Sequence, residues 1–130
     1  VDSYWHCEGP NNPLVMKSLT AQNNVITTAD LIAAGSVVAG TYRASAYIQA
    51  TTASAGGCTS DVTIGWTYNS AAKTKSPISS FNQGIDENFG EASVVFRAQA
   101  GAAITYAVSR AGADCSLNVY DIYLTLEKIQ

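Results

Sequence analysis

Hydrophobic and polar residues alternate along much of this chain, and the alternation is clearest between positions 40 and 69. In 41–52 and again in 61–69, every second side chain is apolar or small. This is the period of a β-strand, because successive side chains of a strand point to opposite faces, so each segment offers one apolar face. The glycine-rich break between them suits a chain reversal. The pattern predicts an antiparallel hairpin at the centre of a β-sandwich.

The remainder of the chain shows the same period in shorter segments. Positions 18–32 are predicted as a strand that is kinked at Asn23 and Asn24, with a helical turn capped by Thr28 as the alternative over 28–34. A loop is predicted at 81–90, and further strands are predicted at 70–81, 91–100, 104–109 and 116–130. The strand at 70–81 has the lysines and proline of an edge strand: Lys73, Lys75 and Pro77.

Seven or eight strands with turn residues about every ten positions are typical of sandwiches and jelly rolls. We therefore predict an all-β fold, an antiparallel β-sandwich that is jelly-roll-like. The predicted core consists of side chains that are in phase on their strands, namely Ile48, Ile64, Trp66, Phe96, Tyr106, Ile122 and Leu124. By contrast, Tyr47 and Tyr123 are out of phase with the apolar set. We interpret them as a subunit interface, where tyrosine is enriched, with a ligand platform as the alternative.

The first residues form no regular pattern. Positions 1–17 contain two prolines, a glycine and paired asparagines, which interrupt strand pairing, so we predict an N-terminal arm there and a β-sandwich domain over 18–130. The arm nevertheless carries Tyr4 and Trp5. Large aromatic side chains are costly to leave in water, and we expect these two to anchor the arm on a neighbouring subunit or on its own sandwich.

Composition narrows the class of protein. The chain of 130 residues is long enough for one domain; 47% of its residues are hydrophobic, and only 13% are charged. The net charge of −3 offers no basic surface for nucleic acid, and no apolar run is long enough to cross a bilayer. The start at Val1, without a signal-peptide layout, leaves a removed leader and a processed chain as alternatives. We expect an extracellular or virion location.

The three cysteines are Cys7, Cys58 and Cys115. If successive strands alternate in direction, Cys58 and Cys115 fall in loops at the same end of the sandwich, and we predict a disulfide between them. Closing a loop of about 57 residues would stabilise the fold by about 4 kcal/mol on the chain-entropy model. Two reduced cysteines are the alternative. Cys7 is left over, either free or bridging subunits.

The residues that could carry chemistry are sparse. Carboxylates at the same end, on Asp61, Asp86, Glu87 and Asp114, are weak candidates for calcium ligands, but no calcium-loop motif accompanies them. Hence we expect no metal and no cofactor. The single histidine, His6, has no second histidine with which to form a zinc site, and no nucleophile elbow is present. A hydrolase that uses two carboxylates is the only enzymatic hypothesis left. We expect that the chain has no enzymatic activity.

The chain resembles a known group of proteins in segments between positions 18 and 127. The segments that carry the resemblance include Gly-Thr-Tyr-Arg-Ala-Ser-Ala-Tyr-Ile at 40–48, Val-Thr-Ile-Gly-Trp-Thr at 62–67 and Leu-Asn-Val-Tyr-Asp-Ile-Tyr-Leu-Thr-Leu-Glu at 117–127. They are similar to small β-sandwich domains of bacteriophage tail, fibre and virion-surface proteins. The resemblance implies a compact jelly-roll-like module, often trimeric, that serves in virion decoration or host-surface binding. It brings no catalytic residues.

Two hypotheses of function follow. The leading one is a structural and interaction protein, a decoration or fibre module of phage type that self-assembles, as a trimer, through its sandwich face and its arm. Its partners would be other virion proteins or a cell-surface glycan. The alternative is a secreted module that binds a glycan with the loop end, where the disulfide would act as a brace.

Overall fold

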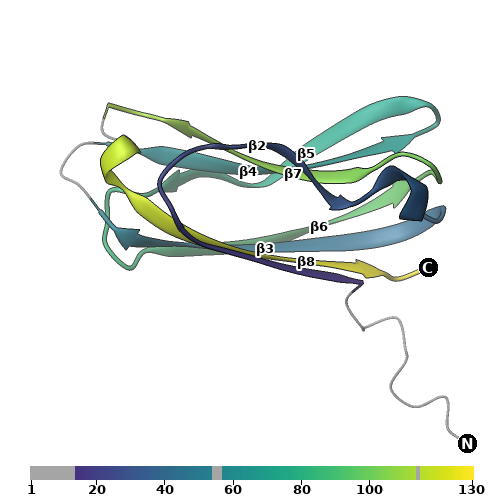
Figure 1. Cartoon of the computed structure of the whole chain (residues 1–130), viewed down its shortest axis with the longest axis horizontal. Helices are drawn as coiled ribbons and strands as arrows, with labels where there is room; N and C mark the ends of the chain where they lie inside the picture. The colour runs from purple at the N-terminus through teal and green to yellow at the C-terminus, as the bar shows by residue number, and fades with distance from the viewer. Residues whose placement is uncertain (1–13, 54–56, 114) are drawn as a thin grey trace, which may run out of the picture.

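The computed structural model describes residues 14–53, 57–113 and 115–130. These residues form two four-stranded antiparallel sheets that lie face to face as two layers (Figure 1). One sheet has the order β1-β8-β3-β6 and the other the order β2-β7-β4-β5. The strands are β1 (Val15–Gln22), β2 (Ile26–Ile32), β3 (Gly40–Thr52), β4 (Thr59–Tyr68), β5 (Ala71–Asn82), β6 (Phe89–Ala98), β7 (Ile104–Ala111) and β8 (Val119–Lys128), with short 3₁₀ helices at Ala34–Ser36 and Cys115–Leu117.

The strand order explains how the chain builds both layers at once. Every connection between successive strands passes from one sheet to the other, except the connection from β4 to β5. Eight strands wound in this way into two antiparallel sheets form a jelly roll. The predicted fold class, an antiparallel β-sandwich of jelly-roll type, is therefore confirmed. Among the described residues, no helix is long and apolar enough to cross a membrane.

The predicted central hairpin is wrong. Strands β3 and β4 do not pair with each other: β3 lies between β8 and β6, whereas β4 lies between β7 and β5 in the opposite sheet. Both strands do present an apolar face, as predicted, but they pack face to face across the core rather than side by side. An alternating pattern determines which side chains point inward, but it does not determine which strand pairs with which. The break between the strands is long enough to cross between two layers about 10 Å apart.

The hairpin that does form joins β4 to β5. Its two turn residues, Asn69 and Ser70, both have positive φ, 52° and 59°, as a tight type I′ turn requires. Asparagine tolerates this left-handed conformation better than most residues do. The β5 strand lies at the edge of its sheet, so the predicted edge strand with its lysines is confirmed.

The core lies between the layers and follows the predicted phase. Burial alternates without interruption along β3 from Tyr42 to Ala50, and six of the seven predicted core residues are buried. The exception is Trp66, which is only partly buried and packs at the margin of the core, with its ring 4.4 Å from that of Phe96. Strands β4 and β5 extend past the core toward the hairpin that joins them. Trp66 lies near this end of β4, which explains its partial exposure.

The first strand begins at Val15, earlier than expected, so the last residues of the predicted arm belong to the sheet. Strands β1 and β2 replace the single kinked strand predicted for 18–32, and they lie in opposite sheets. The predicted anchors Tyr4 and Trp5, together with His6 and Cys7, lie outside the described residues.

Candidate functional site

The outer face of the sheet β1-β8-β3-β6, called here the aromatic face, brings both out-of-phase tyrosines together. Tyr47 on β3 lies directly opposite Tyr123 on β8 on one side and opposite Glu91 on β6 on the other. Directly opposed side chains in neighbouring strands lie within contact distance. The register therefore forms a row across three strands, Tyr123–Tyr47–Glu91, on the surface of the sheet.

A third aromatic side chain flanks this row. Phe89, at the start of β6, stacks on Tyr47 with ring centroids 5.8 Å apart and an angle of 19° between the rings. The ring of Tyr123 lies 5.9 Å from that of Tyr47 at an angle of 51°. Phe89 and Tyr123 are 58% and 40% exposed. The ring of Tyr47 is thus held between two partly exposed aromatic neighbours, a geometry in which aromatic pairs attract one another.

The next row along the strands carries small hydroxyl side chains. Ser45 on β3 lies opposite Thr125 on β8 and opposite Ser93 on β6. Because these side chains are short and the tyrosines beside them are long, a groove forms across the strands. It has a volume of about 360 Å³ and is lined by Ser45, Ala46, Tyr47, Glu91, Ala92, Ser93, Tyr123 and Thr125. This volume lies in the range of ligand pockets, about 300–1,000 Å³.

The charges around the groove are few. Among the residues that the structure describes, Glu91 is the single charged residue of the lining. One row further along, Arg43 forms an ion pair with Glu127 at 3.6 Å, so that its charge is partly compensated. Lysine and arginine contribute nothing to the lining itself. The groove is weakly acidic and rich in hydroxyl groups, and it suits a neutral ligand better than an anionic one.

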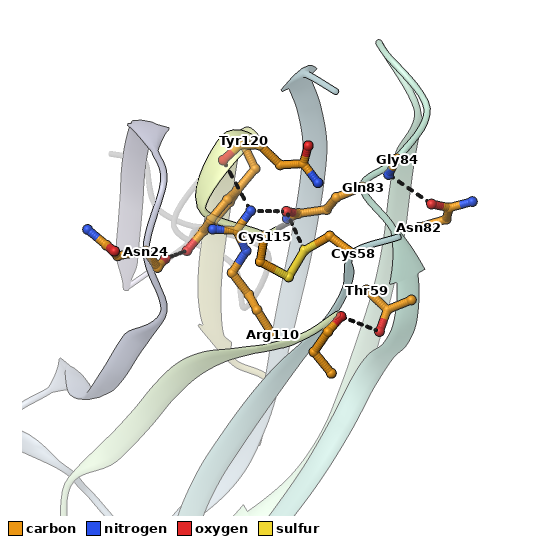
Figure 2. Close-up of a disulfide and its surroundings, with 11 residues drawn as sticks. Asn24, Cys58, Thr59, Asn82, Gln83, Gly84, Arg110, Cys115 and Tyr120 are labelled. Carbon is orange, nitrogen blue, oxygen red and sulfur yellow. Dashed lines mark hydrogen bonds between the residues drawn. A yellow bond between two sulfur atoms is a disulfide. The ribbon is translucent and has the colours of Figure 1, made fainter. Parts of the chain in front are cut away.

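A second region is the loop end of the sandwich, where a disulfide joins Cys58 and Cys115 (Figure 2). Their Cα atoms lie 5.0 Å apart, and the predicted pairing is confirmed. The alternation of strand directions on which it was based holds in the jelly roll, since the start of β4 pairs with the end of β7. Close packing of two glycines supports this end: a Cβ atom at Gly112, where φ is +135°, would collide with the backbone of Gly57.

A polar network lies beside the disulfide. The guanidinium of Arg110 donates to the side-chain oxygen of Gln83 at 2.6 Å and to the backbone oxygen of Asn118 at 3.1 Å, and Figure 2 shows it directed toward Gln83. Its carbon lies 5.2 Å from the ring centre of Tyr120, whose hydroxyl donates to the backbone oxygen of Asn24 at 2.6 Å. Burial raises the pKa of Tyr120 to about 12, against the opposing effect of Arg110. Burial also lowers the pKa of Arg110. The network thus connects the three loops that contain Asn24, Gln83 and Asn118.

The carboxylates proposed as weak calcium ligands do not form a metal site among the described residues. Asp61 accepts a hydrogen bond from the backbone N–H of Ser80 at 2.7 Å, and Asp86 and Glu87 lie in the loop between β5 and β6. No group of three or more histidine, cysteine, aspartate or glutamate side chains in ranges 14–53, 57–113 and 115–130 could hold a metal ion. Asp114 lies outside these ranges.

Sequence reasoning singled out Tyr47 and Tyr123 but missed Phe89 and the hydroxyl row. Phe89 was assigned to the predicted loop at 81–90, although it continues the outward phase of Glu91 and Ser93. This outward phase was the signal in the sequence from which Phe89 could have been identified. The hydroxyl row could not be found in the sequence, because it exists only through the register of three strands that are distant in the chain.

Comparison with known proteins bears on the fold. No family model matches the chain, and no curated protein sequence matches it. Among solved structures, VP2 of infectious bursal disease virus, in a subviral particle, is similar with a TM-score of 0.58 and 15% identity. The match covers 94% of this chain and 34% of that one, so this chain spans about a third of the viral protein. At this identity the likeness concerns the fold alone, and it agrees with the β-sandwich described above.

Two further structures resemble the chain more weakly. One contains N-terminal modules of the endo-1,4-β-D-xylanase 10B of Clostridium thermocellum complexed with xylohexaose, with a TM-score of 0.44, 12% identity and coverage of 87% of this chain and 24% of that one. The other is the Eiger TNF of S. frugiperda, with a TM-score of 0.40, 9% identity and coverage of 92% and 94%. Likeness at this level carries no argument about function.

Proposed function

We propose that this chain is a non-enzymatic recognition module of virion-surface type that contacts its partner with the aromatic face. The observation that carries the proposal is the groove with tyrosine walls and a hydroxyl floor in the middle of this face. Soluble domains seldom leave aromatic side chains grouped on the surface without a partner. Such a groove, with a few polar groups beside aromatic rings, is the usual form of a small binding site.

The distribution of apolar side chains supports this choice of face. The exposed large apolar side chains that lie in strands are Met16, Phe89, Val95 and Tyr123, and all belong to the sheet β1-β8-β3-β6. On the described strands of the other sheet, no large apolar side chain is exposed. An interaction surface would produce this asymmetry, since burial in the domain's own core does not require it.

The jelly-roll fold, the disulfide and the likeness to a viral capsid protein support a place outside the cell, on a virion or in an extracellular structure. A role on a phage particle, as a decoration or fibre module, is the specific form that we propose from the resemblance. The absence of an enzymatic activity is proposed on chemical grounds. Among the described residues, Glu91 is the single carboxylate in the groove, so the groove lacks the pair of carboxylates that a glycoside hydrolase uses.

Self-assembly through the same face is the second candidate function. Met16 and Val95, which are 76% and 56% exposed, extend the apolar surface beyond the groove on both sides, as a contact between copies would use it. The predicted trimer and the predicted attachment of the arm through Tyr4 and Trp5 belong to this candidate and stay predictions.

The test compares the natural chain with a variant that carries Tyr47→Ser and Tyr123→Ser. Light scattering after size exclusion measures association between copies, and electrophoresis in gels that contain soluble polysaccharides measures carbohydrate binding. We expect at least one of the two contacts to depend on the tyrosines. Identical behaviour of the folded variant and the natural chain in both measurements would refute the proposed function. The thermal transition of the variant checks that it is folded.

A further inference from the structure

We infer that the groove binds a short stretch of a neutral carbohydrate chain, lying across strands β8, β3 and β6. This inference rests on the proposed function, since it names the ligand of the same face. It places the carbohydrate site on the sheet and not at the loop end that the sequence had suggested.

The dimensions of the groove come from the register. Its floor is the row Thr125–Ser45–Ser93, and its wall is the row Tyr123–Tyr47–Glu91. Neighbouring strands lie about 4.8 Å apart, so the floor extends about 10 Å from the first strand to the third. An extended, narrow ligand fits this outline, whereas a compact ligand would reach only part of it.

The lining matches the two kinds of surface that a sugar ring presents. The flat face of a pyranose carries C–H groups, which pack on aromatic rings such as Tyr47 and Tyr123. Its rim carries hydroxyl groups, which both donate and accept hydrogen bonds. Serine and threonine hydroxyls do the same and can rotate to suit the partner. Glu91 adds an acceptor at one end of the row.

The wall is fixed before any ligand arrives. The ring of Tyr47 is stacked on Phe89 and contacts the tilted ring of Tyr123, and its hydroxyl lies 3.4 Å from the side-chain oxygen of Gln49. A side chain that is already ordered loses little conformational entropy when it binds. The aromatic platform therefore has the rigidity that a weakly bound, flexible sugar chain requires.

Other occupants fit the groove less well. Within the described part of the chain, its one charged lining residue is acidic and the nearby Arg43 is paired with Glu127, so these residues offer an anionic lipid or phosphate no free cation. A peptide that adds a strand would pair with the free edge of β6 and would not fill the groove, because β8 and β3 are paired on both sides. A second copy would have to insert a narrow projection into a floor of hydroxyl groups, although apolar interface cores are depleted in serine.

The experiment is electrophoresis of the natural chain in gels that contain xylan, a soluble β-glucan, mannan or amylose, with alginate as an anionic comparison. We expect retardation by at least one neutral polysaccharide and none by alginate. Tyr123→Ala should weaken binding about tenfold, as the loss of one aromatic contact does.

Two matched variants separate the groove from general effects. Thr125→Val keeps the shape of the side chain and removes only the hydroxyl, and it should weaken binding about fivefold. Tyr68→Ala removes a tyrosine that contacts Arg97 at 5.1 Å, away from the groove lining, and it should not change binding.

The outcomes distinguish this inference from the proposed function. If no neutral polysaccharide retards the natural chain, the inference is overturned. If copies of the chain then associate in a manner that depends on Tyr47 and Tyr123, the aromatic face is a self-contact, and the proposed function survives without the carbohydrate. If retardation occurs but is equal in Tyr123→Ala, Thr125→Val and the natural chain, carbohydrate binds elsewhere and the inference is again overturned.

Discussion

The two outer faces of the sandwich are built on the same core and differ in the aromatic side chains that point outward. The aromatic face carries Tyr47, Phe89 and Tyr123 around its groove, beside its row of hydroxyl side chains. The outer face of the sheet β2-β7-β4-β5, called here the threonine face, carries small hydroxyl side chains and, on its described strands, no exposed aromatic side chain. They include Thr63, Thr74, Ser76, Thr105 and Ser109.

Several side chains of the threonine face contact one another closely. The hydroxyls of Thr63 and Ser76 are hydrogen bonded to one another at 2.8 Å. Gly65 lies so close to Thr105 that a Cβ atom there would meet its Oγ1 at 2.5 Å. A shallow hollow of about 300 Å³ near Thr63 contains no aromatic side chain. Inward positions explain the fold of both sheets, while outward positions distinguish a face with exposed aromatic side chains from a face without them.

The largest expected effect concerns the disulfide, which belongs to neither face. Replacing both Cys58 and Cys115 by alanine should lower the free energy of unfolding by about 4 kcal/mol, because a long loop is released in the unfolded chain. Denaturant unfolding measures the loss. At low temperature, where the variant is still folded, carbohydrate binding should persist, since the groove lies in the middle of a sheet. A folded variant that had lost its binding would tie the groove to the loop end.

Tyr120 and Tyr123 on β8 point to opposite faces of the sheet, and they provide the second comparison. Tyr120 points inward, and its pKa is about 12 because burial disfavours the ionised phenol. A raised folded-state pKa means that the related stability is fully present below pH about 10 and is lost as the pH rises from about 10 to about 12. We expect a loss of about 2–3 kcal/mol over this window. Thermal unfolding against pH measures it, and Tyr120→Phe should remove this part of the pH dependence.

Crowding on the threonine face gives a third prediction. Gly65→Ala should destabilise the protein by about 1–2 kcal/mol, because the new methyl group displaces the Thr105 side chain. Adding Thr105→Ala should restore most of the loss in a chemical-denaturation experiment. Carbohydrate binding should be the same in all three proteins. An effect on binding would mean that the threonine face takes part in recognition.

The smallest expected effect on stability comes from the groove itself. Thr125→Val and Tyr123→Ser should each change the free energy of unfolding by less than about 1 kcal/mol, because their side chains point away from the core. Ile122→Ala, one position from Tyr123 but fully buried, should cost about 2–5 kcal/mol. Equal losses for Tyr123 and Ile122 would contradict the division between outward and inward positions.

Much of this division could be predicted from the sequence. The alternation along 41–52 and 116–130 correctly placed Ile48, Ile122 and Leu124 in the core. The directions of the strands correctly paired Cys58 with Cys115. Both inferences depend on local geometry, since the period of a strand and the reversal of its direction at each turn are properties of the backbone.

The pairing of strands could not be predicted. An apolar face on β3 and another on β4 are compatible with a hairpin and with two packed layers, because both arrangements turn these faces toward the core. The groove depends on this pairing, because it needs Ser45, Ser93 and Thr125 in one row. Trp66 was misjudged for a related reason: its phase is inward, but its position near the end of β4 lies at the margin of the core.

The central claim, that the aromatic face holds a neutral sugar chain, is tested most directly by residue-resolved NMR. The amide resonances of the natural chain are followed during titration with a hexasaccharide cut from the polysaccharide that retards the protein most. The account predicts saturable shifts at Ser45, Tyr47, Glu91, Ser93, Tyr123 and Thr125, with none at Thr63 or Gly65. Shifts confined to the loop end around Cys58 and Arg110, or to the threonine face, would contradict it.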